Sequence, residues 1–180
     1  MRRKNPDKRT LEIIRKISPY LKTEDKILDI GSGNCRVCHV LQQKGLPVTA
    51  LDIKNRSRVS TILPTIYDGK KLPFSDDSFD VSLLITVLHH TQDPIAILKE
   101  AKRVSKRIIV MEDLYDRTFQ KYATFLMDSI YNLEFFNHPH NNMTEAKWKK
   151  IFAELNLRVV DEQKNNWWIF FTSGTFCLEK

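Results

Sequence analysis

A short apolar run followed by two closely spaced glycines constrains the fold of this chain more than any other feature. The run is KILDIGSGN at residues 26–34. Its apolar residues predict a buried parallel strand, because a strand covered on both faces by helices is apolar almost throughout. Gly31 and Gly33 permit a tight turn in which the backbone approaches a ligand without a Cβ in the way. Residues 34–43 continue with helical spacing of apolar side chains, and strand, glycine turn and helix together predict a nucleotide-like ligand at the carboxyl end of an open α/β sheet.

Two carboxylates indicate which ligand this turn suits. A dinucleotide fingerprint would place a third glycine where this chain has Arg36. Asp29, two residues before the first glycine, would repel a phosphate, whereas it suits a ligand with an ammonium group and a sulfonium. Residues 46–53 predict a second strand ending in Asp52, which is placed to accept hydrogen bonds from ribose hydroxyls. NAD sites share that last feature, and a plain strand-to-helix connection is the alternative for the glycines alone.

Three blocks of the sequence resemble one enzyme family. Residues 28–33, LDIGSG, are similar to motif I of the class I S-adenosylmethionine-dependent methyltransferases. Residues 68–90, DGKKLPFSDDSFDVSLLITVLHH, resemble a run of the small-molecule branch that includes the ubiquinone and menaquinone methyltransferases, and residues 93–104 also match that branch. The resemblance covers residues 10–113 well. It implies a Rossmann-like, doubly wound α/β fold with a mostly parallel seven-stranded sheet, an antiparallel final strand and helices on both faces.

The resemblance also implies a cofactor, S-adenosyl-L-methionine, and assigns residues to its parts. The amino acid end would be held by Asp29 and the glycine turn, the ribose by Asp52, and the adenine by Asp68 and Gly69. The cofactor-binding residues expected on this basis are Asp29, Gly31, Ser32, Gly33, Asp52, Ile53, Asp68, Gly69 and Thr86. For Asp68 the alternative is a turn aspartate before glycine, which is a common pair.

Residues Thr86 to His90 would form the wall between the cofactor and the methyl acceptor. His89 and His90 follow a continuous apolar run at its carboxyl end, and either is a candidate general base. They can equally hold the loop or pack against the cofactor. Methyl transfer from a sulfonium does not strictly need a base, so the catalytic residues stay unassigned.

The remaining pattern predicts one domain over residues 1–180, with a basic N-terminal segment and leading helix in residues 1–25. In the resembled family a helix at this place caps the cofactor crevice. Helices are predicted at residues 10–21, 94–104 and 144–154, with a polar, possibly helical stretch at 54–63. Further strands are predicted at residues 65–68, 80–88, 108–111 and 157–160, and residues 168–178 predict either a hairpin around Ser173-Gly174 or one long bulged strand.

Residues 114–142 are rich in aromatic side chains and leave the carboxyl end of the predicted fifth strand. A helix packed on the core is the simpler interpretation, with Phe119, Tyr122 and Phe125 on one face. In the family's layout the segment would roof the acceptor site, where it would exclude the water that competes for the methyl group. We therefore expect it to be a lid that determines specificity.

The cysteines form a C-x-x-C-H pattern at residues 35–39, which matches both c-type haem attachment and half of a zinc site. Haem attachment needs an exported protein, and zinc needs two more ligands although Cys177 is the only other cysteine. We expect no metal site and interpret the cysteines as small buried residues at a helix start. A thiol at the amino end of a helix can still be reactive.

The chain has a net charge of +7, concentrated in two basic clusters. They comprise Arg2, Arg3, Lys4, Lys8, Arg9, Arg15 and Lys16, and Lys102, Arg103, Lys106 and Arg107. A basic surface is compatible with an RNA partner, although a solvated terminus and an exposed helix end explain it more simply. No apolar run is long enough to span a bilayer and no secretory signal is recognised, so a cytoplasmic location is expected, and the oligomeric state is open.

These observations predict an S-adenosylmethionine-dependent methyltransferase that acts on a small-molecule acceptor. An RNA methyltransferase is the first alternative, and a non-catalytic cofactor-binding subunit is another. An NAD-linked oxidoreductase is disfavoured by Arg36 and Asp29. The sequence does not identify the acceptor atom.

Overall fold

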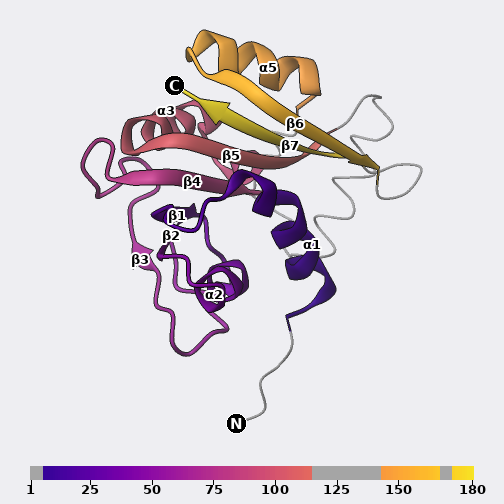
Figure 1. Cartoon of the computed structure of the whole chain (residues 1–180). Helices are drawn as coiled ribbons and strands as arrows, with labels where there is room; N and C mark the ends of the chain where they lie inside the picture. The colour runs from indigo at the N-terminus through magenta and orange to yellow at the C-terminus, as the bar shows by residue number, and fades with distance from the viewer. Residues whose placement is uncertain (1–5, 115–142, 167–171) are drawn as a thin grey trace.

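The structure is a computed structural model that describes residues 6–114, 143–166 and 172–180. Within these ranges the chain forms one seven-stranded sheet in the order β3-β2-β1-β4-β5-β7-β6 (Figure 1). The strands are β1 (Ile27–Ile30), β2 (Val48–Asp52), β3 (Thr65–Ile66), β4 (Phe79–Ile85), β5 (Ser105–Leu114), β6 (Arg158–Asn166) and β7 (Thr172–Glu179). The helices are α1 (Lys8–Ile17), α2 (Arg36–Gln43), α3 (Pro94–Val104) and α5 (Glu145–Glu154), with short 3-10 helices η1 (Ser18–Tyr20) and η2 (Leu88–His90).

The strand directions confirm the expected fold class. Strands β3, β2, β1, β4 and β5 pair in parallel, and β7 pairs antiparallel with both β5 and β6. The final strand is therefore the antiparallel member of an otherwise parallel sheet. Parallel neighbours bring the carboxyl ends of β1 to β4 to the same edge, which is where an open α/β sheet binds ligands.

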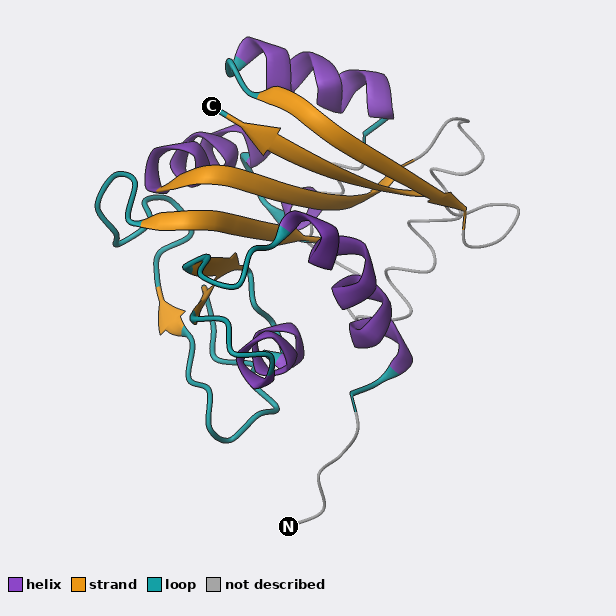
Figure 2. Cartoon of the chain, viewed as in Figure 1, coloured by secondary structure: helices purple, strands orange, loops and turns teal. Residues whose placement is uncertain are grey.

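Helices cover both faces of the sheet (Figure 2). Helices α1 and α2 pack on one face, and α3 and α5 pack on the other. Adjacent residues of β4 show the division, because Leu83 is buried under the first pair of helices and Leu84 under the second. This alternation follows from the two-residue period of a strand and explains why the central strands are mostly apolar on both faces.

Several elements differ from the sequence expectation at their ends, and β6 runs to Asn166 where a strand at residues 157–160 was predicted. Strand β4 stops at Ile85 rather than continuing to residue 88, and Thr86 follows with a φ of 49°, a left-handed conformation that a strand cannot contain. Residues 88–90 turn into η2 instead. Strand β5 begins at Ser105, directly after α3, and runs to Leu114, so it is longer than predicted at both ends.

The possibly helical stretch at residues 54–63 was a wrong prediction, because these residues form a loop. Its short polar side chains bond to the backbone beside them. Asn55 Oδ1 accepts from the Ser57 N–H at 3.1 Å, and Ser57 Oγ accepts from the Val59 N–H at 3.2 Å. Such local hydrogen bonds offer the backbone an alternative to helical pairing.

Ser173 and Gly174 lie inside β7, so the predicted hairpin around them does not form, and the pairing of β7 with β5 continues through them without a bulge. Ser173 pairs with Asp113 and Gly174 with Glu112. A Cβ on Gly174 would lie 2.8 Å from Leu114 Cδ1 and 2.8 Å from the Phe176 ring. This glycine therefore provides room for packing rather than a turn. Residues 168–171 of the predicted element lie outside the described residues.

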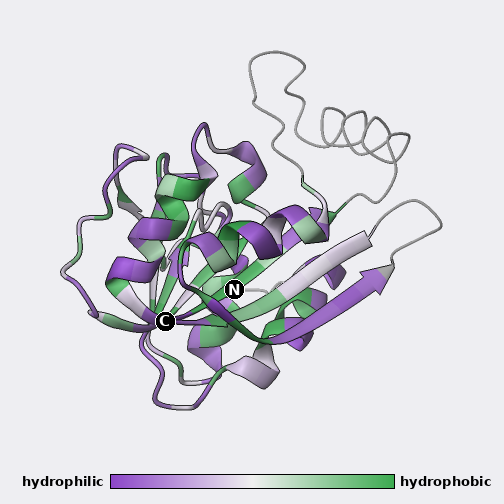
Figure 3. Cartoon of the chain, turned by 90° about the horizontal axis from the view of Figure 1, so that it is seen from above, coloured by the Kyte–Doolittle hydropathy of each residue, from purple (hydrophilic) through white to green (hydrophobic). Residues whose placement is uncertain are grey.

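The open edge of the sheet is formed by β6, whose residues are mostly polar (Figure 3). Its pairing with β7 contains a register shift between Val159 and Asp161. Charged side chains and a bulge both discourage an edge strand from pairing with another chain. No helix among the described residues is both long and apolar enough to cross a membrane.

Some residues of the two basic clusters are buried or paired within the fold. Lys16, counted above with a basic surface, is 1% exposed, and its Nζ donates to Ser173 Oγ at 3.1 Å. Helix α1 carries this residue on the face that packs against the sheet, and burial lowers the pKa of the lysine. The expectation that Lys16 contributes to a solvated basic surface was therefore wrong.

The second cluster is paired as well. Arg103 bonds to Glu100 and Asp76, and it also donates to the backbone carbonyl of Phe74 at 2.7 Å. Lys106 pairs with Asp80 at 2.9 Å, and Arg107 pairs with Asp25 at 3.0 Å. The Lys102 ammonium donates to the carbonyl of Leu155 at 2.7 Å. These ion pairs and hydrogen bonds hold the loops around α3 and β4 in place.

Candidate functional site

The residues expected to bind the cofactor meet at one edge of the sheet. The Gly31 and Ser32 N–H groups donate to the Leu51 carbonyl of β2 at 2.8 and 3.0 Å. The Gly33 N–H donates to Asp52 Oδ2 at 2.8 Å. The glycine turn after β1 and the carboxylate at the end of β2 therefore form one unit, held by the turn's own backbone donors.

Glycine is present at positions 31 and 33 for two different physical reasons. Gly31 has a φ of 76°, and a Cβ there would lie 2.3 Å from Val87 Cγ2, so a side chain would displace the loop after β4. Gly33 has a φ of 51°, and the nearest atom to its Cβ position is the Gly31 carbonyl oxygen at 3.9 Å. Gly31 thus permits close packing, whereas Gly33 borders open space that a ligand can occupy.

The carboxylate of Asp52 is 8% exposed, and it shapes the turn beside it. Besides the bond from Gly33, its Oδ1 accepts from the Lys54 N–H at 3.1 Å. Next to it Ile53 is 51% exposed, and its Cγ2 lies 3.4 Å from the position of a Cβ on Gly69. An exposed apolar side chain beside a bare glycine offers a surface for a flat aromatic base.

Asp68 stabilises its own turn, which is the alternative role considered for it in the sequence analysis. Its Oδ1 accepts from the Lys70 N–H at 2.9 Å and the Lys71 N–H at 3.2 Å. These backbone donors hold the pKa of the exposed carboxyl below its usual range. The side chain therefore organises its own turn, and the adenine contact stays a prediction.

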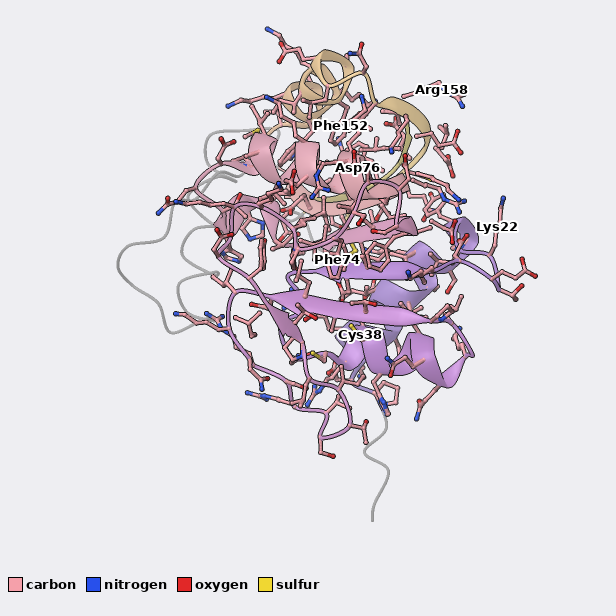
Figure 4. The ribbon with its side chains drawn as sticks, turned by 90° about the vertical axis from the view of Figure 1, so that its left-hand side faces the viewer. Lys22, Cys38, Phe74, Asp76, Phe152 and Arg158 are labelled. Atoms are coloured by element: carbon pink, nitrogen blue, oxygen red, sulfur yellow. The ribbon has the colours of Figure 1, made fainter. Side chains whose placement is uncertain are left out.

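Asp29 is buried beneath the glycine turn. Its Oδ2 accepts from the Cys38 thiol at 2.9 Å, and burial raises the pKa of the carboxyl to about 7. Cys38 lies between α2 and the sheet (Figure 4). Because the pKa is close to neutral, the charge of this site depends on pH in the physiological range.

The leading helix is tied to the same edge by residues that the sequence analysis did not assign to the site. Asp7 caps α1 by accepting from the Thr10 N–H at 2.8 Å, and it also pairs with Arg36, the residue standing where a dinucleotide fingerprint has glycine. Arg9 donates to Thr86 Oγ1 at 3.4 Å. The capping pattern Asp7-x-x-Thr10 was visible in the sequence, but its partner Arg36 was not predictable from spacing.

Glu112 organises the loop that carries the two histidines, and sequence reasoning missed it. Its Oε1 accepts from the Val87 N–H at 3.0 Å and the Leu88 N–H at 2.7 Å. Its Oε2 lies 2.5 Å from His89 Nδ1. Glu112 is 1% exposed and His89 is 2% exposed. This geometry favours the loop-holding hypothesis for His89, and a buried acidic residue near a strand end was the available signal.

The contacts of Glu112 predict a large stability effect. Glu112→Ala leaves two backbone N–H groups and the His89 ring without their buried partner, so we expect the free energy of unfolding to fall by about 3–5 kcal/mol. Glu112→Gln keeps an oxygen for the backbone donors and should cost less than about 2 kcal/mol. Urea unfolding measures both. An alanine variant as stable as the wild type would show that Glu112 does not hold this turn.

Other expected features are not tested by the described residues. The aromatic lid falls almost entirely in residues 115–142, outside the described ranges.

A cavity of about 120 Å³ lies beside Leu114, Gly174 and Phe176. This volume is too small for a typical metabolite by itself. Among the described residues no group of three or more His, Cys, Asp or Glu side chains is placed to hold a metal ion.

The match to a known family is extensive. Residues 1–162 match the model of a family described as "Methyltransferase domain". A solved structure of a SAM-dependent methyltransferase from Methanosarcina mazei superposes with a TM-score of 0.72 at 19% identity, covering 91% of this chain and 96% of that one. At this identity the likeness shows the fold alone.

Two curated relatives have named activities. A demethylmenaquinone methyltransferase from Tropheryma whipplei is 30% identical over an alignment of 107 positions, and the match covers 53% of this chain and 44% of the relative. A tRNA U34 carboxymethyltransferase from Nautilia profundicola is 25% identical over an alignment of 178 positions, and the match covers 85% of this chain and 58% of the relative. The chain thus spans about half the length of these relatives.

Proposed function

Because this chain belongs to the methyltransferase-domain family, we propose that it transfers a methyl group from S-adenosyl-L-methionine to a small-molecule acceptor. The observation that carries the proposal is the unit of Gly33 and Asp52, where a bare glycine borders open space and a largely buried carboxylate holds the turn. Cofactor and acceptor would meet at the carboxyl edge of the parallel strands.

The residues present fit this cofactor. The space at Gly33 admits a ligand against the backbone, and each Asp52 oxygen, although it accepts one backbone N–H, can accept a further bond from a ribose hydroxyl. Ile53 and Gly69 would flank the adenine. The cofactor supplies a methyl group on a sulfonium, which makes it electrophilic. Asp29 would attract the ammonium group of the amino acid end when its carboxyl is ionised.

The chain would accelerate methyl transfer by aligning the cofactor with the acceptor and by excluding water. Alignment of two reactants can supply about 7–11 kcal/mol of a barrier. Thr86 is held by its N–H bond to the Met111 carbonyl at 2.7 Å, and the loop after it is fixed by Glu112. The cofactor-facing wall would thus be rigid before the acceptor arrives. We place no proton transfer on His89, whose Nδ1 faces Glu112.

The basic cluster around α3 gives little support for RNA as the acceptor. Three cations of the cluster around α3 pair with carboxylates of this chain, namely Arg103, Lys106 and Arg107. Cations that are already paired contribute little to phosphate binding, because an intramolecular bond must be given up. The relative named for tRNA keeps the RNA alternative testable. RNA retention on a gel that weakens steeply with salt would support it.

The proposal is tested by transfer of labelled methyl from S-adenosylmethionine to a metabolite library that includes phenols and quinone precursors. We expect a labelled product and equimolar S-adenosylhomocysteine with the wild type, and neither with Asp52→Ala. Label found in RNA instead of in a small product would indicate an RNA methyltransferase, which is the alternative function. Tight cofactor binding without turnover on either class would favour a non-catalytic cofactor-binding subunit, and absence of binding would refute the proposal.

A further inference from the structure

Two cysteines at the start of α2 are not explained by the proposed function. Cys35 is the N-cap residue of α2, with a φ of 58°, and Cys38 follows within the first turn. Both side chains are fully buried, and they share a small cluster with Ala50 and Ile62. A strand followed by C-x-x-C at a helix start is an arrangement that supports dithiol–disulfide chemistry, because the helix terminus stabilises a thiolate and the spacing places the sulfurs together.

The neighbours of the pair supply what such chemistry needs. Cys38 Sγ lies 2.9 Å from Asp29 Oδ2, and Cys35 Sγ lies 3.6 Å from Ser32 Oγ. Contact with the Cys38 side chain lowers the pKa of the Cys35 thiol, and the same contact raises the pKa of Cys38. Cys35 is therefore the better nucleophile of the pair, and Cys38 keeps the proton that it donates to Asp29.

Cys35 is the sulfur that lies next to the glycine turn, 3.9 Å from the Gly33 carbonyl oxygen. The third cysteine, Cys177, is buried in β7 in the core cluster under α1 and α2. Because both sulfurs of the pair are fully buried, only an oxidant as small as a peroxide is expected to reach them.

We propose that Cys35 and Cys38 are a redox site, which a peroxide converts to a disulfide with Asp29 accepting the Cys38 proton. The Cys35 thiolate, whose proton has passed to solvent, attacks a peroxide oxygen, the O–O bond breaks, and a sulfenic acid and hydroxide form. The proton released by Cys35 converts this hydroxide to water. The Cys38 sulfur then attacks the Cys35 sulfur and expels a second hydroxide, which the proton held on Asp29 converts to water. In total two thiols and hydrogen peroxide give one disulfide and two waters.

The disulfide would also act on the cofactor turn, a step that rests on the proposed function. Oxidation removes the S–H donor from Asp29, and that donor is what lowers the pKa of this buried carboxyl. Without it the carboxyl keeps its proton at neutral pH and attracts a cationic ligand less. We expect the oxidised protein to bind S-adenosylmethionine about tenfold more weakly than the reduced protein, because a smaller fraction of Asp29 is ionised.

Trypsin offers a direct test, because Arg36 lies between the two cysteines. The full chain is treated with hydrogen peroxide, free thiols are alkylated under denaturing conditions, and the tryptic peptides are mapped without reductant. We expect peptides 27–36 and 37–44 to stay linked, to separate after dithiothreitol, and to remain linked in the matched control Cys177→Ser. Cys38→Ser should give no linked pair.

Each outcome decides a separate claim. Separated peptides with both cysteines alkylated or over-oxidised would overturn the redox site, and no variant needs to fold for this result. A linked pair with unchanged cofactor affinity by calorimetry would overturn the switch. Reduced protein that binds no S-adenosylmethionine would overturn the proposed function instead, while a linked pair would still support the redox site.

Discussion

Replacing Asp52 with alanine is expected to weaken S-adenosylmethionine binding by about 100-fold or more. A buried carboxylate that accepts two ribose hydroxyls makes charge-assisted hydrogen bonds of about 1.5–3 kcal/mol each, and their loss multiplies in the dissociation constant. The substitution also removes the acceptor of the Gly33 and Lys54 N–H groups, so the glycine turn loses its anchor. Isothermal titration of the wild type and the variant measures the effect.

Asp80 provides a matched control for this substitution. Its Oδ2 also accepts a backbone N–H, from Lys26 at 3.0 Å, but it lies at the amino end of β4, on the opposite edge of the sheet. Asp80→Ala should lower stability without changing cofactor affinity. If Asp52→Ala binds the cofactor as tightly as the wild type, the ribose assignment is refuted. Equal losses in both variants would indicate a general loss of folded protein.

The affinity for S-adenosylmethionine should rise about tenfold between about pH 6 and about pH 8, through the ionisation of Asp29. Burial raises the pKa of this carboxyl to about 7, so below that pH most molecules hold it neutral. The cationic ligand favours the ionised form, and binding therefore strengthens as the proton leaves. Asp29→Asn should bind more weakly than the wild type and show no such rise. A wild-type affinity that is constant over this range would contradict the charge role.

The same ionisation has the opposite effect on the stability of the protein without ligand. The pKa of Asp29 is higher in the folded chain than its ordinary value of 3.8, so its contribution is fully present below about pH 4 and is lost as the pH rises to about 7. The shift corresponds to up to about 4 kcal/mol. Urea unfolding of the wild type and Asp29→Asn over this range should show a decline only in the wild type, and parallel curves would contradict it.

The fold was predictable because its signals are local. The burial of residues 27–30 and the helix at 94–104, which begins at a proline after its N-cap Asp93, both follow from composition and periodicity over a few residues. The stretch at 54–63 was not predictable, because side chains there compete with the helix for the same backbone groups. The end of β4 escaped prediction as well, since the left-handed Thr86 follows an uninterrupted apolar run.

The sequence by itself determined the strand, the glycine turn, the helix and the order of the carboxylates along the chain, because each depends on neighbours within one turn or one strand. Only the tertiary structure decided which groups those carboxylates contact. Asp29 contacts Cys38, Glu112 holds the loop of His89, and Lys16 is buried against Ser173. Partners that are far apart in the sequence are brought together by the way the helices pack on the sheet. No spacing pattern in the sequence identifies such partners.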